Sequence, residues 1–163
     1  MDAGTPGGYS PGWRRVLAGL EAGLWGGVAM LAWFGLGAAL SRRSIWIVAS
    51  SLGSLFEPHA PVRSGFSAAT LAGLALLVFT SSLAGMLFAL LVRQPRSTRR
   101  VRLLGMLTGL VWYYLSQVLF WGQVGPVSGY SSPPAMLVAY LIFGMVLGWY
   151  PSRLRSLERH FLG

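Results

Sequence analysis

Residues 16–40 read VLAGLEAGLWGGVAMLAWFGLGAAL, an uncharged run that is interrupted only by Glu21. As an α-helix this run would be roughly 37 Å long, which exceeds the hydrocarbon thickness of a bilayer, about 30 Å. A cleaved signal peptide would have a shorter apolar region of about 7–15 residues. The stretch therefore predicts a retained transmembrane span that also directs insertion of the chain.

The rest of the chain contains three more uncharged stretches of suitable length, at residues 67–92, 103–121 and 135–150. The last of these is the shortest, and it follows Pro133 and Pro134, which suit the first turn of a helix. Composition agrees, because 10% of the 163 residues are charged, whereas an ordinary soluble domain has about 25%. We therefore predict an all-α integral membrane protein in which residues 13–152 form an antiparallel four-helix bundle.

The arginines predict how the chain is oriented. All 13 basic residues are arginine, and the net charge is +9. Ten of them would lie on one face of the membrane: Arg14, Arg15, Arg93, Arg96, Arg99, Arg100, Arg102, Arg153, Arg155 and Arg159. Only Arg42, Arg43 and Arg63 would lie on the other face. By the positive-inside rule the ten-arginine face and both termini are cytoplasmic, and the same rule explains the charge without nucleic acid as a partner.

Three segments are expected to lie outside the spans. Residues 1–12 are rich in Gly and Pro and are predicted to be disordered. Residues 44–56 are predicted to form an amphipathic helix on the outer membrane surface. Its apolar side would consist of Ile45, Val48, Ala49, Leu52, Leu55 and Phe56, with Ser50, Ser51 and Ser54 pointing away. Residues 153–163 mix apolar and basic residues and predict an amphipathic tail on the cytoplasmic surface.

Glycines recur at four-residue spacing in three of the predicted spans. They are Gly19, Gly23 and Gly27 in the first span, Gly105 and Gly109 in the third, and Gly144 and Gly148 in the fourth. Because lipid gives helices no hydrophobic reward for association, close packing through small residues must hold them together. We expect these faces to pack the bundle against itself or to contact another subunit.

The spans also resemble one another in pairs. The first and third share a Gly-x-x-x-Gly-Leu pattern followed by a tryptophan, at residues 19–25 and 105–112. The second and fourth share a late Gly-Met, at residues 85–86 and 144–145. Duplicated hairpins occur in many membrane proteins, and a shared composition would give the same likeness.

Glu21 is the only ionisable residue well inside a predicted span. Such residues are costly in lipid and are by default functional candidates. Arg14 lies two turns away on the same helix face. One interpretation is therefore a structural ion pair, or a carboxylate that reaches back to the interface. The other is that Glu21 handles protons or cations.

Other polar residues offer little chemistry. The chain has no cysteine, which excludes disulfides and thiolate metal sites. His59 and His160 are expected on opposite faces of the membrane, so we predict no shared metal site. His59 beside Glu57 could instead sense pH, bind a metal or serve a lipid-modifying enzyme at the outer surface. The alternative is that His59 is an ordinary solvated loop residue.

An arginine cluster follows the second predicted span. It consists of Arg93, Arg96, Arg99, Arg100 and Arg102, with Pro95 inside it. Contact with anionic lipid headgroups accounts for a cluster at this position. A loop that binds a protein or a substrate is the alternative interpretation.

Several short segments mark the order of these features along the chain. They are residues 19–23 (GLEAG), 45–46 (IW), 66–67 (FS), 73–76 (GLAL) and 143–148 (FGMVLG). In this order the chain resembles small uncharacterised four-span bacterial inner-membrane proteins, over most of its length. The resemblance implies a four-span topology in the bacterial inner membrane and no known activity.

These observations favour a non-catalytic accessory or scaffold subunit of a larger bacterial membrane complex. Its partners would be membrane lipids and either other membrane subunits or further copies of the chain. The alternative is a small oligomeric transporter or ion-conducting protein in which Glu21 takes and releases a proton. We expect no enzymatic activity, and the sequence identifies no cofactor.

Overall fold

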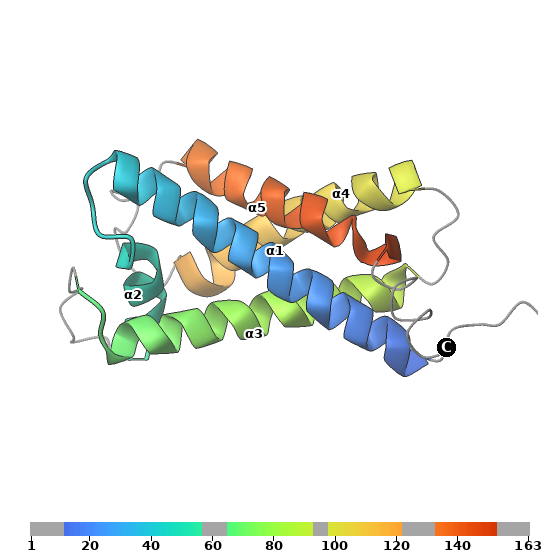
Figure 1. Ribbon diagram of the computed structural model, residues 1–163, viewed down its shortest axis with the longest axis horizontal. Helices are drawn as coiled ribbons and strands as arrows, with labels where there is room; N and C mark the ends of the chain where they lie inside the picture. The colour runs from blue at the N-terminus through green and yellow to red at the C-terminus, as the bar shows by residue number, and fades with distance from the viewer. Residues whose placement is uncertain (1–11, 57–64, 93–97, 122–132, 153–163) are drawn as a thin grey trace, which may run out of the picture.

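The computed structural model describes residues 12–56, 65–92, 98–121 and 133–152. The regular structure in these ranges is helical and consists of α1 (Gly12–Leu40), α2 (Ile47–Gly53), α3 (Ala68–Leu91), α4 (Thr98–Ser116), the π-helical turn η1 (Gln117–Trp121) and α5 (Pro133–Leu147) (Figure 1). The prediction of an all-α protein is confirmed for this part of the chain. The predicted terminal segments 1–12 and 153–163 lie outside the described residues, apart from Gly12.

Three described segments are long and apolar enough to cross a membrane: Gly12–Leu40, Ala68–Leu91 and Pro133–Ser152. They correspond to the predicted spans at residues 16–40, 67–92 and 135–150. The expectation of helices suited to a bilayer is therefore confirmed for these three. α4 does not belong to this set, because Arg99, Arg100 and Arg102 occupy its first two turns.

The long helices form two pairs, which we call the first hairpin (α1 and α3) and the second hairpin (α4 and α5). α1 packs along α3 and α4 packs along α5, while α1 also packs on α5 and so joins the pairs. α3 and α4 barely touch. Figure 1 shows the start of α1, the end of α3, the start of α4 and the end of α5 at one end of the molecule. We call it the arginine-rich end, because it carries Arg14, Arg15, Arg99, Arg100 and Arg102.

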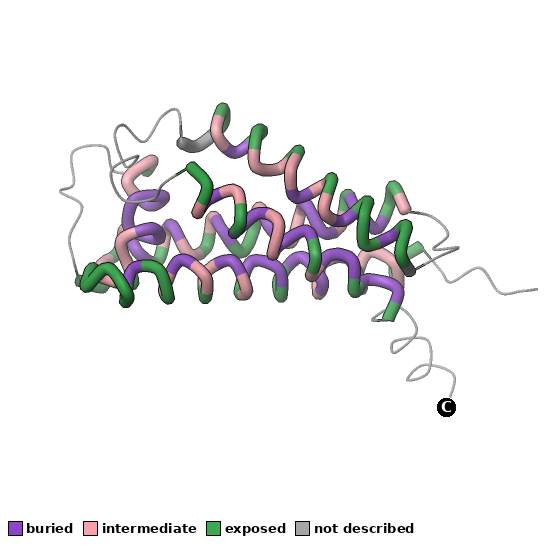
Figure 2. Tube along the Cα trace, turned by 90° about the horizontal axis from the view of Figure 1, so that it is seen from above, coloured by how far each residue is buried: buried purple, intermediate pink, exposed green. Residues whose placement is uncertain are grey.

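Two clusters of buried side chains form the interior. The cluster toward the arginine-rich end contains Ala18, Ala22, Ala84, Phe88, Ala89, Val101, Phe143, Leu147 and Tyr150. The cluster toward the opposite end contains Met30, Phe34, Val48, Leu52, Leu77, Met136, Ala139 and Tyr140. Buried and exposed residues alternate along each helix, so that one side of each helix faces the interior of the molecule (Figure 2). Large apolar side chains such as Leu36, Phe79 and Val118 are exposed on the outside, as suits a surface in contact with lipid.

The short helix α2 packs directly on α3 at backbone distance. A methyl group on Gly73 would overlap the carbonyl group of Ala49, and one on Gly53 would overlap the carbonyl group of Ala69. All of α2 from Val48 to Gly53 is buried as a result. α2 is therefore part of the bundle rather than a helix that lies on its outside.

The serines of α2 correct one detail of the sequence analysis. Ser50 and Ser51 were expected to point away from the membrane domain, and that expectation is wrong, because both are buried. The Ser50 hydroxyl lies 2.8 Å from the Thr70 hydroxyl of α3, and the Ser51 hydroxyl donates to the carbonyl of Ile47 at 2.7 Å. These partners offset the cost of burying polar groups, so the serine side of α2 can face inward.

α1 ends in a Schellman motif built around Arg42. The amide of Arg42 donates to the carbonyl of Ala39 at 3.1 Å, and the amide of Arg43 donates to the carbonyl of Ala38 at 2.8 Å. Arg42 has a φ of 53°, the left-handed conformation for which glycine is preferred at this position. The chain turns sharply here and leads into α2.

Candidate functional site

Glycine backbones bring α1 and α3 together in the first hairpin. A methyl group on Gly19 would lie 2.6 Å from the carbonyl oxygen of Gly85 and 2.6 Å from Cβ of Ala89. A methyl group on Gly23 would overlap the carbonyl oxygen of Ser81. Both distances are shorter than van der Waals contact, so the two helices cross at a separation that only glycine permits at these positions.

The second hairpin contains a crossing of the same kind. A methyl group on Gly105 would overlap the carbonyl oxygen of Gly144 and lie 3.0 Å from the amide nitrogen of Gly148. A methyl group on Gly109 would overlap the carbonyl oxygen of Tyr140. The glycines at four-residue spacing in α4 and α5 therefore face one another.

The two crossings use equivalent positions. In each hairpin the first of the spaced glycines in the N-terminal helix contacts a glycine in the C-terminal helix, which is Gly85 in the first hairpin and Gly144 in the second. It also contacts the small residue one turn after that glycine. The second glycine meets the carbonyl one turn before it, that of Ser81 or Tyr140. The pairwise likeness between spans in the sequence is thus accompanied by a likeness in helix geometry.

Gly26 and Gly27, which are adjacent in α1, contact different helices. A methyl group on Gly27 would lie 2.5 Å from the hydroxyl oxygen of Ser81 in α3. A methyl group on Gly26 would lie 2.6 Å from the ring of Phe143 in α5. Gly26 therefore brings the two hairpins together, a role that the sequence analysis missed. The signal was available in the Gly26-Gly27 pair, because neighbouring residues point to different sides of a helix.

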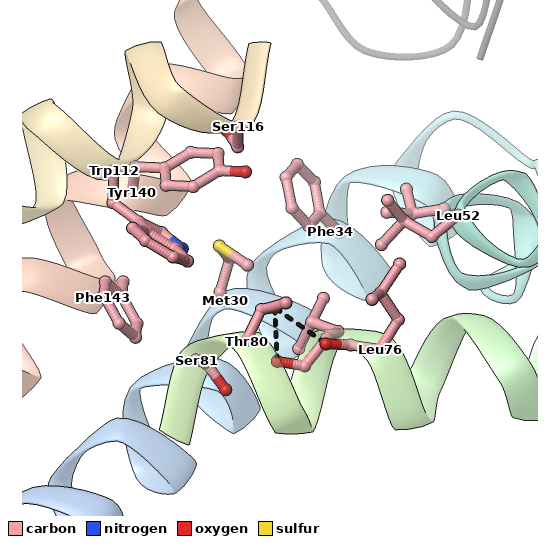
Figure 3. A pocket seen from close by; sticks show the side chains of 12 residues that line it. Met30, Phe34, Leu52, Leu76, Thr80, Ser81, Trp112, Ser116, Tyr140 and Phe143 are labelled. Atoms are coloured by element: carbon pink, nitrogen blue, oxygen red, sulfur yellow. Dashed lines mark hydrogen bonds between the residues drawn. The ribbon is translucent and has the colours of Figure 1, made fainter. Parts of the chain in front are cut away.

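A small cavity lies between the two hairpins (Figure 3). Its volume of about 20 Å³ is enough for one water molecule. It is lined by Met30, Phe34, Val48, Leu52, Leu76, Leu77, Thr80, Ser81, Trp112, Ser116, Tyr140 and Phe143. These residues come from α1, α2, α3, α4 and α5, so the cavity is the place where all of these helices meet.

The serine and threonine hydroxyls around this cavity donate to their own helices. Thr80 donates to the carbonyl of Leu76 at 2.8 Å, and Ser116 donates to the carbonyl of Tyr113 at 2.8 Å. Ser81 donates to the carbonyl of Val78 at 3.1 Å. Each hydroxyl oxygen retains a lone pair for an incoming donor. The cavity is thus weakly polar, and the residues that line it include no carboxylate.

A larger groove of about 400 Å³ lies on the outside, between α1 and α5. It is lined by Ala22, Trp25, Val28, Ala29, Ala32, Val146 and Trp149. Trp25 and Trp149 are half exposed, and the alanines between them leave the space that makes the groove. The lining is apolar, which suits a ligand or partner that is itself within the membrane.

Glu21 is half-buried on α1 and lines neither the cavity nor the groove. It precedes Trp25 by four positions, so it lies one helical turn closer to the arginine-rich end. Glu21 has an interaction partner in the structure. The ion-pair and proton-handling interpretations of Glu21 therefore both stay predictions.

The arginine cluster is described only in part. Arg99, Arg100 and Arg102 are exposed at the start of α4, and the backbone of Arg102 lies close to Gly148, which directly follows α5. Arg93 and Arg96 lie outside the described residues, as do Glu57, His59 and His160.

Within the described ranges, no three His, Cys, Asp or Glu residues come close enough together to hold a metal ion. No protein-family model matches the chain, and no similar protein was found among curated proteins or solved structures. Proposals about function therefore depend on the residues and helix contacts described above.

Proposed function

We propose that this chain is a four-span membrane protein that serves as a non-catalytic accessory or scaffold subunit of a larger bacterial membrane complex. The proposal goes beyond the three helices suited to a bilayer, because it places α4 in the membrane as a fourth span. It also places the arginine-rich end in the cytoplasm and assigns the outside of the bundle to contacts with neighbours.

Two features support a fourth span. α4 packs along α5 through Gly105 and Gly109, so a membrane that contains α5 surrounds α4 as well. Its outward side is apolar, with exposed Leu103, Leu107, Val111, Leu115 and Val118. From Leu103 to the end of η1 the helix is roughly 28 Å long, close to the hydrocarbon thickness of a bilayer. The arginines before Leu103 would then lie among the lipid headgroups.

The orientation rests on the separation of arginines between the two ends. Arg14, Arg15, Arg99, Arg100 and Arg102 lie at one end of the described bundle, and Arg42 and Arg43 lie near the other. The positive-inside rule assigns the end with more arginines to the cytoplasm. Both ends of the described chain would then be cytoplasmic, in a bacterial inner membrane.

The observation that carries the scaffold proposal is the pair of equivalent glycine crossings. They fix α1 on α3 and α4 on α5 at backbone distance, and the Gly26–Phe143 contact joins the two hairpins. The hydroxyls of Thr80, Ser81 and Ser116, where the two hairpins meet, donate to their own helices. The helices thus form a closely packed frame, and its large apolar outer surface is available to neighbouring proteins.

Photo-crosslinking in the native membrane tests this role. A photo-reactive amino acid would replace, one at a time, an outward residue of each helix: Val28, Phe79, Val111 or Met145. A scaffold should give a discrete adduct with one membrane protein from at least one helix, and that protein should co-purify after polymer extraction without detergent. Adducts with lipid alone from all four positions, together with a protein that purifies as a monomer, would overturn the proposal.

The small transporter is kept as a second candidate because of one observation. Two equivalent hairpins enclose a cavity lined by hydroxyl groups, and transporters built from repeats bind substrate where the repeats meet. Glu21 does not line that cavity, so a proton pathway through Glu21 would run elsewhere. Loss of proton flux in vesicles with Glu21→Gln, and unchanged flux with Arg100→Gln, would favour this candidate.

A further inference from the structure

The groove between α1 and α5 has the dimensions of a site for a single hydrocarbon chain. From Ala22 to Ala32 it follows α1 for about 15 Å, which is about half the hydrocarbon thickness of a bilayer. Its volume of about 400 Å³ lies in the range of small-ligand sites. A partner helix of the same length and about 10 Å in diameter would occupy roughly 1,200 Å³. The groove therefore has room for a hydrocarbon chain, whereas a helix would contact it only through side chains inserted from outside.

Charged residues continue the line of the groove toward the arginine-rich end. Arg14, Glu21, Trp25 and Ala32 follow one another at intervals of seven, four and seven residues, which places them on one side of α1. Arg14 is half-buried and lies about 12 Å below the first groove residue, Ala22, at the level expected for headgroups. The side of α1 that forms the groove is thus apolar along the groove and carries Glu21 and then Arg14 toward the arginine-rich end.

Trp149, two residues after the end of α5, completes this end of the groove. It belongs to the last described turns of the α5 segment, at the arginine-rich end, and it is half exposed. Tryptophan is enriched at the boundary between hydrocarbon and headgroups, because its ring is apolar and its N–H needs a polar partner. A lipid whose chain lies between Trp25 and Trp149 would have its glycerol region at this level.

We propose that the groove binds one anionic phospholipid from the leaflet at the arginine-rich end, with an acyl chain against the α1 alanines and the phosphate near Arg14. This inference does not depend on the scaffold role. The net charge of +9 favours an acidic headgroup, and Arg14 supplies a positive charge in line with the chain. Glu21 lies between the two and reduces the local positive charge.

Retention of phosphatidylglycerol by the full chain tests the proposal. The protein would be purified in mild detergent, incubated with equal amounts of phosphatidylglycerol and phosphatidylcholine, washed, and analysed for bound lipid by native mass spectrometry. Ala29→Trp fills the groove, and Ala75→Trp adds the same side chain to the exposed side of α3, outside the groove. Ala29→Trp should lose the retained phosphatidylglycerol, and Ala75→Trp should keep it.

The charged end is tested separately. Arg14→Gln should lower phosphatidylglycerol affinity about fivefold, whereas Arg100→Gln, which removes a charge at the same end outside the groove, should have a smaller effect. Glu21→Gln should raise the affinity. Melting temperatures would verify that each variant is folded.

Unchanged lipid retention in both Ala29→Trp and Arg14→Gln would overturn the inference. So would a change in oligomeric state, or loss of a co-purifying protein, in Ala29→Trp when its bound lipid is unaltered, since either result would assign the groove to a protein. Absence of a protein partner in every variant would contradict the scaffold role and leave the lipid result intact.

Discussion

The Ser50 hydroxyl of α2 and the Thr70 hydroxyl of α3 lie 2.8 Å apart, and both side chains are almost completely buried. Thr70 also takes part in the capping box with Ser67 that begins α3. The first turn of α3 is therefore linked both to its own cap and to α2. This link holds a seven-residue helix that is too short to be stable by itself.

Ser50→Ala should weaken the attachment of α2. The substitution removes one buried hydrogen bond and leaves the capping box intact, so we expect a loss of about 1 kcal/mol. Thermal unfolding in detergent, followed by circular dichroism, would measure the lower melting temperature. Thr108→Val is the matched control, because the Thr108 hydroxyl donates only within its own helix, to Leu104 at 2.8 Å. Equal losses in both variants would contradict the assigned link.

Alanine at the glycine crossings should destabilise both hairpins. In Gly85→Ala and Gly144→Ala the new methyl group would overlap the backbone of the facing helix, and we expect a loss of about 1–3 kcal/mol in each. Gly35→Ala is the control, because nothing lies within 4 Å of the new methyl group. The control should gain about 0.5–1 kcal/mol from its lower unfolded-state entropy. A stable Gly85→Ala variant would show that α1 and α3 do not cross as described.

Arg42→Gly should stabilise the protein. Arg42 is in the left-handed conformation, which costs a non-glycine residue about 1 kcal/mol or more. Arg43→Gly removes the same charge at a position where no positive φ occurs, so it should bring no gain. A higher melting temperature for Arg42→Gly alone is the expected outcome, and equal shifts in the two variants would trace the effect to charge.

Single cysteines can test the number of spans, since the chain has none of its own. Trp13, Ser41 and Ser152 are exposed and lie near the ends of helices. With four spans, a membrane-impermeant maleimide should label Ser41→Cys in intact cells and label Trp13→Cys and Ser152→Cys only after permeabilisation. Opposite accessibility of positions 13 and 152 would indicate three crossings, and labelling in denaturant would control for expression.

Long apolar runs made the three most hydrophobic helices predictable, because a bilayer imposes both length and composition. The predicted start at residue 16 is four residues later than Gly12, where α1 begins. The predicted span began only after Arg14 and Arg15, although arginines are compatible with a helix that extends into the headgroup region. The same reasoning placed the third span at residue 103, whereas α4 begins at Thr98.

The position of α2 could not be predicted from its own pattern. Its apolar and serine sides suggested a helix between lipid and water, and the pattern contained no sign of Gly73 or Thr70, which are remote in sequence. The sequence also could not predict which helix each glycine face contacts, because the spacing of small residues identifies a face suited to close packing but not the helix that packs on it. The contact of Gly26 with Phe143 could not be predicted for that reason, because it depends on the arrangement of the two hairpins.

The burial of α2 has a consequence for biosynthesis. α1 and α2 leave the ribosome before α3 exists, so the serines of α2 have no interhelical partner at that stage and the short helix cannot yet be stably inserted. The arrival of α3 would supply Thr70 and the glycine backbone together and draw the segment into place. The second helix of the first hairpin, α3, is thus also the element that completes the packing of α2.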